Sequence, residues 1–280
     1  MSTTVKNFSY VDAAFGYMPG GEEQAPFWRG FHWGLFDDPD NLDCDPGRYY
    51  LAAEAMTAAV VDAGGITDNS RVLDVGCGFG GTLDHIAETR KGCRLAGVNV
   101  DERQLVRARE LLAEYGRGGQ TIPFITADGC KLPVQTGTLD HVLAVECLFH
   151  FPSRKKFFQE AFRVLKPGGT VAITDFVAGD GSLHNIITRT AKSGLGDNSW
   201  YGHQAKPLTV SGYERLGRSC GLPVIVNRDV TDETMPTYPA LRNLYYGAGF
   251  PEGAASIDSL EDLAKTRDLE YRVIAFQKKA

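Results

Sequence analysis

An apolar strand that runs into a carboxylate and then into closely spaced glycines constrains this chain more than any other feature. The stretch reads VLDVGCGFGG over residues 72–81. Glycine lets the backbone turn sharply and pass close to a ligand, because it has no Cβ. The spacing of Gly76, Gly78 and Gly81 satisfies the G-x-G-x-x-G pattern of dinucleotide sites. It predicts a strand, a tight turn and a helix arranged around a bound small molecule.

The carboxylate of Asp74, just before the first glycine, changes which ligand fits. In a pyrophosphate site the amide N–H groups at a helix N-terminus meet negative charge, which Asp74 would repel. A ligand with a cationic amine suits this position better. The pattern D-x-G-x-G-x-G, here Asp74 to Gly80, resembles that of class I S-adenosylmethionine-dependent methyltransferases. The resemblance implies an α/β, Rossmann-like class I methyltransferase fold: a seven-stranded, mostly parallel sheet with helices on both faces and a helical, aromatic lid.

Strand-like segments alternate with segments of helical periodicity along most of the chain. Strands are predicted near residues 71–75, 93–98, 122–127, 139–145, 169–176, 223–230 and 269–279. Helices are predicted near residues 49–61, 101–116, 153–166 and 208–222. The third of these helices has Ser153 as its N-cap and is expected to stop at Pro167. Such alternation is typical of a parallel sheet with helices on both faces, and the resemblance implies that the last two strands form an antiparallel hairpin.

A length of 280 residues with 43% hydrophobic content is enough for one full core. We therefore expect one domain with a lid rather than two independent domains. The predicted division is an N-terminal lid and helix at 1–62 and a methyltransferase core at 63–280. Within the core we expect a lid insert at 178–208 and a C-terminal insert at 232–267, whose tyrosines could form a homodimer contact.

Charge and composition exclude several other classes of protein. A formal net charge of −6 shows no electrostatic footprint for nucleic acid. No apolar run approaches the roughly 18–20 residues that span a bilayer, and the N-terminus lacks a signal-peptide pattern. The six cysteines are scattered without a C-x-x-C pair, which favours free thiols in a cytoplasmic protein. We expect no metal, because metal-ligand spacing of His, Asp and Glu is absent.

The resemblance implies S-adenosyl-L-methionine as cofactor and S-adenosyl-L-homocysteine as product. Asp74, Gly76, Cys77 and Gly78 are then expected to lie against the cofactor. We interpret Cys77 as a small, tolerant residue rather than a nucleophile, because nothing near it in sequence depresses its pKa.

The end of the second strand departs from the family pattern. The family has an acidic residue there that holds the ribose hydroxyls, whereas this chain has Asn99 followed by Val100. An Asn amide can still donate to and accept from a hydroxyl. Asp101 is either an alternative ribose ligand or the cap of the following helix, and both readings stay open.

The segment ITADGCKLP after the third strand is similar to the adenine-binding segment of the family. The resemblance implies that Asp128 accepts from the exocyclic amine and that the backbone of Gly129 or Cys130 meets the ring. Leu132 could pack against the ring. The alternative is an ordinary polar turn after a strand.

The stretch AVECLFHFPSRKKFFQEAFRVLKPGGTVAITDF, residues 144–176, resembles small-molecule methyltransferases of natural-product pathways. In sugar O-methyltransferases of that group, two consecutive histidines follow the fourth strand and an aspartate ends the fifth. Here Phe149 takes the first histidine position, His150 keeps the second and Asp175 matches the aspartate.

We therefore predict His150 as the general base, because a free pKa of about 6.5 lies near working pH. Asp175 is expected to orient the imidazole or to contact the acceptor, and Phe149 to lie on the acceptor side. The alternative is a structural histidine and a polar strand end. Glu146, at the end of the fourth strand, could face the amine of the methyl donor, the acceptor or solvent.

Two aromatic segments are candidate lids. PFWRGFHWGLFDDP, residues 26–39, resembles the H-W-G lid motif of the same relatives. The resemblance implies that His32 and Trp33 cover the methionine part of the cofactor, where ring faces attract a sulfonium. The alternative is a packing cluster for the N-terminal helix. In the 178–208 insert, Trp200, Tyr201 and His203 are expected to shape the acceptor pocket, with His203 as a second candidate base.

Together these features predict S-adenosylmethionine-dependent methyl transfer to an oxygen or carbon of a small-molecule natural product. Two other readings stay open. A methyltransferase-like protein could bind the cofactor and act as a cyclase or a non-catalytic partner. A nicotinamide-dependent oxidoreductase is opposed by Asp74 and by the LKPGG turn at residues 165–169.

Overall fold

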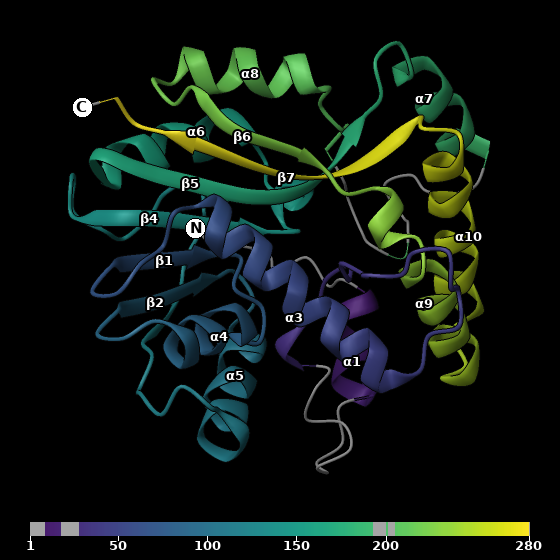
Figure 1. Cartoon of the computed structure of the whole chain (residues 1–280), viewed down its shortest axis with the longest axis horizontal. Coiled ribbons are helices and arrows are strands. Elements are labelled where there is room, and N and C mark those ends of the chain that lie inside the picture. The colour runs from purple at the N-terminus through teal and green to yellow at the C-terminus, as the bar shows by residue number, and fades with distance from the viewer. Residues whose placement is uncertain (1–8, 18–27, 193–199, 201–204, 280) are drawn as a thin grey trace.

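A single mixed sheet organises the protein, as seen in a computed structural model that describes residues 9–17, 28–192, 200 and 205–279. In this part of the chain, seven strands pair in the order β3-β2-β1-β4-β5-β7-β6 (Figure 1). β7 is antiparallel to both of its neighbours, and the other adjacent pairs are parallel. The predicted seven-stranded, mostly parallel fold is confirmed. The strands are β1 (Arg71–Val75), β2 (Arg94–Asn99), β3 (Phe124–Thr126), β4 (Leu139–Val145), β5 (Leu165–Ala178), β6 (Val224–Asp229) and β7 (Leu269–Gln277).

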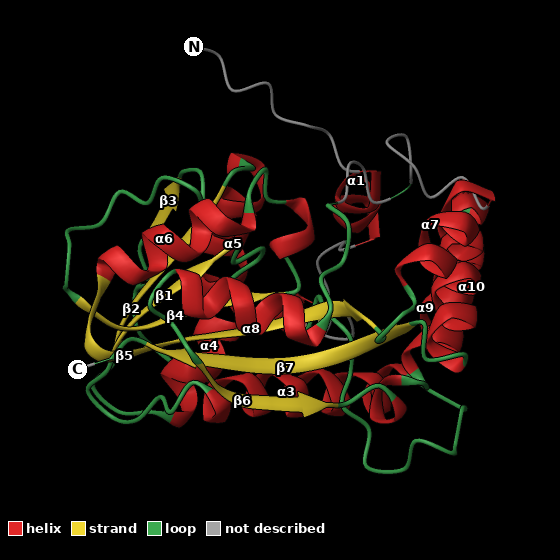
Figure 2. Ribbon diagram, turned by 90° about the horizontal axis from the view of Figure 1, so that it is seen from above, coloured by secondary structure: helices red, strands yellow, loops and turns green. Residues whose placement is uncertain are grey.

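Helices cover both faces of this sheet (Figure 2). Several begin at the residue types that cap orphan N–H groups: the side chain of Asp45 accepts from the amide of Arg48, and that of Ser153 accepts from the amide of Lys156. The helices of the described residues are α1 (Ser9–Tyr17), α3 (Pro46–Ala63), α4 (Gly81–Thr89), α5 (Glu102–Tyr115), α6 (Arg154–Val164), α7 (Leu183–Lys192), α8 (Val210–Ser219), α9 (Thr237–Gly247) and α10 (Pro251–Lys265).

The central strands feed two hydrophobic cores, because successive residues of a strand point to opposite faces. Val72 on β1 packs in the core shared with α3, α4 and α5, and the next residue, Leu73, packs in the core shared with α6 and α8. Leu143 and Val142 on β4 divide in the same way. Burial on both faces explains why these strands read as continuous apolar runs.

The boundary between α6 and β5 lies earlier than predicted. The helix ends at Val164 and the strand begins at Leu165, whereas the sequence predicts a stop at Pro167. Two causes act together. The residue before a proline is disfavoured in the helical region, and the fully buried Leu165 pairs with Leu139 on β4.

The inserts lie at one end of the sheet. Figure 1 shows α7, α9 and α10 gathered beyond this end, and α9 packs against α10. Ligands of open α/β sheets bind at the carboxyl ends of the parallel strands, so these helices lie where they can enclose one. Among the described helices, none has the length and apolar character needed to cross a membrane. All six cysteines are free thiols.

Candidate active site

A cavity of about 260 Å³ lies at the carboxyl ends of the parallel strands. Val75 of β1, Asn99 of β2, Val145 of β4 and Phe176 of β5 line it from the sheet. The segment 28–33 and the helical inserts line it from the other side. A concave, mainly apolar space at this edge is where a small-molecule site is expected in such a fold.

Asp74 presents a buried carboxyl group to this cavity. Its side chain is 2% exposed, and Oδ1 has no hydrogen-bond partner among the described residues. Burial raises the pKa of Asp74 to about 7, because a low-dielectric environment disfavours the charged form. A buried polar group without a partner is costly. The site therefore suits a ligand that brings a positive charge or a donor.

The glycine-rich loop combines close packing with open space. A Cβ at Gly76 (φ 80°) would lie 2.7 Å from Sγ of Cys147, so only glycine fits. Gly78 is also left-handed (φ 52°), but its Cβ would meet nothing within 4 Å, and the residue lines the cavity. The amides of Gly76 and Cys77 both donate to Val98 O, at 2.7 and 3.1 Å. Burial raises the pKa of the Cys77 thiol, which keeps it protonated.

Asn99 and Val100 line the cavity, as predicted for the end of β2. The side-chain amide of Asn99 donates to Oε1 of Gln104, and its oxygen accepts from the amide of Val100, both at 2.8 Å. Asp101 instead caps α5 by accepting from the amide and guanidinium of Arg103. The structure thus favours the capping interpretation of Asp101, whereas Asn99 and Gln104 both line the cavity.

The segment after β3 is divided between the cavity and the core. Asp128 and Gly129 line the cavity, and Asp128 accepts from the amide of Cys130 at 2.8 Å. Cys130 and Leu132 are not among the lining residues, and Leu132 is buried in the core under α6. Phe151 provides the apolar surface expected of Leu132, because its ring lies beside Gly129, where a Cβ would approach it to 2.8 Å.

His32 and Trp33 line the cavity from the N-terminal segment. Nδ1 of His32 lies 3.0 Å from Trp33 O, and Nε2 lies 2.9 Å from the hydroxyl of Thr57. Burial lowers the pKa of His32, which favours the neutral ring. Because a carbonyl can only accept, Nδ1 carries the proton and Nε2 accepts from Thr57. His32 is therefore held in one tautomer and fixes the path of the segment.

Glu146 is a half-buried residue that joins this segment to the sheet. Its Oε2 accepts from the amide of Trp33 at 2.9 Å and from the hydroxyl of Tyr271. Its own amide donates to Thr174 O at 3.1 Å, in a left-handed conformation with φ 48°. Burial raises the pKa of Glu146 to about 8. Of its three predicted positions, the solvent-exposed one is wrong, because Glu146 lines the cavity.

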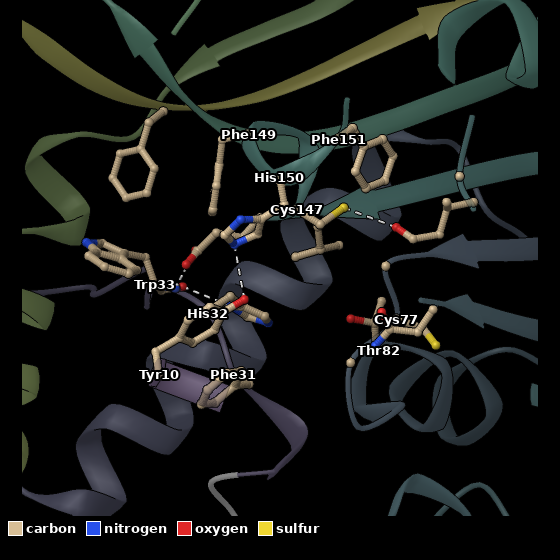
Figure 3. Close-up of a pocket in the computed structure, with 18 of the residues that line it drawn as sticks. Tyr10, Phe31, His32, Trp33, Cys77, Thr82, Cys147, Phe149, His150 and Phe151 are labelled. Atoms are coloured by element: carbon tan, nitrogen blue, oxygen red, sulfur yellow. Dashed lines mark hydrogen bonds between the residues drawn. The ribbon is translucent and has the colours of Figure 1, made fainter. Parts of the chain in front are cut away.

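His150 lies in a short turn after β4, beside Phe149, and both line the cavity. Nε2 of His150 is 3.1 Å from the hydroxyl of Tyr10, and the two rings stack with centroids 5.7 Å apart. Figure 3 shows these side chains across the cavity from Cys77 and Thr82. Burial raises the pKa of Tyr10 well above its ordinary value, so the hydroxyl stays protonated.

Asp175 does not lie where the sequence predicted. Its fully buried carboxylate accepts from the hydroxyl of Tyr213 on α8 and from Nη2 of Arg154 on α6. Alternation along β5 points Asp175 to the face covered by these helices, whereas Phe176 points into the cavity. The predicted role of Asp175 in orienting His150 or contacting the acceptor is contradicted by this arrangement.

The second predicted lid is described only in part. Tyr201 and His203 lie outside the described residues. The ring of Trp200 packs against Tyr245 and Phe250, with centroids 5.4 and 5.2 Å away. Trp200 is not among the cavity-lining residues, so its contact is with the C-terminal insert.

Several lining residues escaped the sequence analysis, among them Tyr10, Gln104 and Phe151. Gln104 left a signal, because it is a polar residue beside Leu105 on the helix face that turns inward. Phe151 stands next to His150 in sequence, which could have marked it. Tyr10 left none, since nothing local predicts that α1 returns to the carboxyl ends of the strands.

Fold and cavity together define an α/β protein with a small-molecule cavity at the carboxyl edge of its sheet, where the buried carboxyl group of Asp74 suits a positively charged ligand. Residues 73–173 match the family model described as "Methyltransferase domain". The chain is 31% identical over 219 residues to methyltransferase GfsG of Streptomyces halstedii, covering 78% of this chain and 74% of that relative. It therefore belongs to the S-adenosylmethionine-dependent methyltransferases.

Two further comparisons extend this result. The sterol 24-C-methyltransferase of Saccharomyces cerevisiae is 30% identical over 217 residues, which are 74% of this chain and 52% of that protein. The structure of geranyl diphosphate C-methyltransferase from Streptomyces coelicolor, solved with Mg²⁺, geranyl diphosphate and S-adenosyl-L-homocysteine, has a TM-score of 0.74. It is 16% identical and covers 99% of this chain and 100% of that chain. At this identity the structural likeness shows the fold alone.

The described residues fit S-adenosylmethionine, the cofactor of this family. Oδ1 of Asp74 is an orphaned buried acceptor that a cationic group can satisfy. At Gly78 the loop leaves open the space that a side chain would fill. Within the described ranges, no group of three or more His, Cys, Asp or Glu residues could hold a metal ion.

Proposed function

We propose that this protein transfers the methyl group of S-adenosylmethionine to an oxygen or carbon atom of an apolar, natural-product-like small molecule, with His150 as general base. One observation carries the proposal above all others. His150 lines the same cavity as Asp74 and Gly78, so a candidate base and the cofactor loop face one space.

At one end of the cavity we assign a residue or pair of residues to each part of the cofactor. S-adenosylmethionine, when bound, supplies a methyl group on a positively charged sulfur that also serves as leaving group. We assign Asp74 to its ammonium group, Asn99 with Gln104 to its ribose hydroxyls, and Phe151 beside Gly129 to the flat base. With an activated methyl group at hand, the protein mainly has to position the acceptor and exclude water.

The opposite end of the cavity is apolar. Phe149, Phe176, Ile186, Leu260 and Leu263 line it, from the sheet edge, α7 and α10. Burial of apolar ligand surface against such side chains contributes about 25 cal/mol per Å². The names of two relatives include a sterol and geranyl diphosphate, both with hydrocarbon skeletons, which supports an apolar acceptor here as well.

Two titratable side chains compete for the role of base at this end. A neutral imidazole at His150 can take a proton from an acceptor hydroxyl or from an acidic C–H bond near neutral pH. The hydroxyl of Tyr10, 3.1 Å from Nε2, fixes the orientation of the ring. Burial raises the pKa of Glu146 to about 8, which favours its protonated form near neutral pH, so we assign the base role to His150.

The test is methyl transfer by purified protein. The protein is incubated with methyl-labelled S-adenosylmethionine and a panel of hydroxylated and isoprenoid apolar molecules, and release of S-adenosyl-L-homocysteine is measured. For an acceptor that is methylated, His150→Ala is expected to lower turnover by roughly 10²–10⁴-fold without changing S-adenosyl-L-homocysteine affinity.

Glu146→Gln is the companion variant. Near-normal turnover of His150→Ala across pH, with loss in Glu146→Gln, would transfer the base role to Glu146. Tight cofactor binding without product from any member of the panel would favour the cyclase or non-catalytic reading.

A further inference from the structure

The N-terminal segment passes through a slot between α3 and α4 that admits only backbone. We call residues 28–33 the strap. A Cβ at Gly30 would lie 2.2 Å from the Cβ of Ala53 on α3. A Cβ at Gly81, the first residue of α4, would lie 2.2 Å from the carbonyl oxygen of Arg29 and 2.3 Å from its Cα. The third glycine of the loop motif therefore leaves room for the strap.

An ionic cluster around a buried guanidinium holds the strap in this slot. The guanidinium of Arg29, 2% exposed, lies 2.9 Å from Glu54 on α3, 2.7 Å from Asp84 and 2.7 Å from Glu88 on α4. The other carboxylate oxygen of Glu54 lies 2.9 Å from Nδ1 of His85. A buried guanidinium needs such partners, because an unpaired charge in the interior is strongly unfavourable.

The strap also contacts the cofactor loop and faces the cavity. Phe31 packs edge-on against Phe79 of the loop, with ring centroids 5.6 Å apart. Trp28 and Trp33 line the cavity together with Gly78. At its far end the amide of Trp33 is held by Glu146. The strap is thus tied at both ends and crosses the side of the cavity that the glycine-rich loop occupies.

We propose that Arg29 is a positioning residue that locks the strap across the cofactor, and that release of the cofactor product requires the strap to leave its slot. The inference rests on the proposed position of the cofactor at residues 74–78. It does not depend on His150 or on the acceptor. Because only the locked strap would contact the cofactor, loss of the lock is expected to raise both the dissociation rate and the dissociation constant.

The test uses the close approach of Gly30 to Ala53, where only one of the two positions can carry a methyl group. Gly30→Ala overfills the slot, and overpacking of this kind is expected to raise the dissociation constant and the dissociation rate of S-adenosyl-L-homocysteine about tenfold. Ala53→Gly in the same chain removes the opposing methyl group and is expected to restore both values to within about threefold of the parent. Calorimetry and stopped-flow displacement measure the two quantities.

Two further variants keep the test decisive. Gly81→Ala adds a methyl group against the backbone of Arg29 and is expected to raise the dissociation rate as Gly30→Ala does. Gly247→Ala, in α9 with nothing within 4 Å of the new Cβ, is the matched control and is expected to bind as the parent does. Parental dissociation rates in Gly30→Ala and Gly81→Ala would overturn the proposal. Weaker ligand binding in the double variant of Gly30→Ala and Ala53→Gly than in Gly30→Ala alone would also overturn the proposal. That result indicates a general folding defect, because a glycine within a helix lowers stability further.

Discussion

Replacing Asp74 by asparagine is expected to raise the stability of the ligand-free protein and to weaken ligand binding. Asp74 is 2% exposed, and burial raises its pKa to about 7. In an unfolded chain the same group titrates near 3.9. Because the folded pKa is the higher one, the ligand-free protein binds a proton more tightly than the unfolded chain and loses stability as pH rises from about 4 to about 7. A shift of about three units, at about 1.36 kcal/mol each, sets this loss at up to about 4 kcal/mol.

Asp74→Asn keeps the size of the side chain and removes its charge. An unpaired buried amide costs about 1–3 kcal/mol, which is less than the buried carboxylate at high pH. The variant is expected to be about as stable as the parent at pH 4 to 5, where the parent carboxyl group is neutral, and about 3 kcal/mol more stable at pH 8 in the ligand-free state. Urea unfolding followed by circular dichroism at both pH values measures the difference.

Binding is expected to change in the opposite sense. If the cationic ligand needs the ionised form of Asp74, the apparent dissociation constant scales as 1 + 10^(pKa − pH). With a pKa of about 7, this factor is about 11 at pH 6 and about 1.1 at pH 8, so the parent should bind about tenfold more tightly at pH 8. Calorimetric titration with S-adenosyl-L-homocysteine at both pH values measures the ratio. Protonation of the ligand itself affects parent and variant equally, so it cancels when the two proteins are compared.

Two results would refute this reasoning. One is parental affinity in Asp74→Asn, which would show that no positive group meets this carboxylate. The other is a variant less stable than the parent at pH 8, which would show that the carboxylate has a partner in the ligand-free protein.

The remaining predictions concern the glycine-rich loop and the buried aspartate. Gly78→Ala is expected to destabilise the fold by about 1–2 kcal/mol through its left-handed backbone and to weaken S-adenosyl-L-homocysteine binding about tenfold or more by filling the cavity. Gly65→Ala, also left-handed (φ 68°) with open space around it, should show the same loss of stability with parental affinity; equal affinities in the two variants contradict the cofactor position. Asp175→Asn is expected to lower stability by about 3–5 kcal/mol, because it leaves Arg154 buried without its counter-ion. A large loss of turnover in Asp175→Asn at parental melting temperature would instead return Asp175 to the catalytic machinery.

Local patterns predicted the sheet well, because burial on both faces leaves continuous apolar runs between polar turns. Strands β1 and β4 have the predicted bounds, and the capping side chain of Ser153 lies where its sequence context places it. These features depend on neighbours along the chain. For the same reason the glycines at 76 and 78 could be interpreted from their spacing and from the carboxylate that precedes them.

Contacts between residues far apart in sequence could not be predicted from such local patterns. Asp175 was predicted to serve the acceptor, but its partners Arg154 and Tyr213 stand 21 and 38 residues away in sequence. Their side chains come together only because α6 and α8 cover the same face of β5. The stacking of Tyr10 on His150 spans 140 residues, and no periodicity near the N-terminus indicates it.

Glu146 makes the cavity depend on residues that lie far apart in the sequence. Its carboxylate joins Trp33, from near the start, to Tyr271, from near the end, and its amide needs Thr174 on the strand between. The segment that holds Trp33 is made well before β7, so the anchor of this segment on Glu146 is complete only when β7 is in the sheet. A chain in which β7 is not yet in place therefore lacks one of the contacts that hold the pocket together, and ligand capture is expected to need β7.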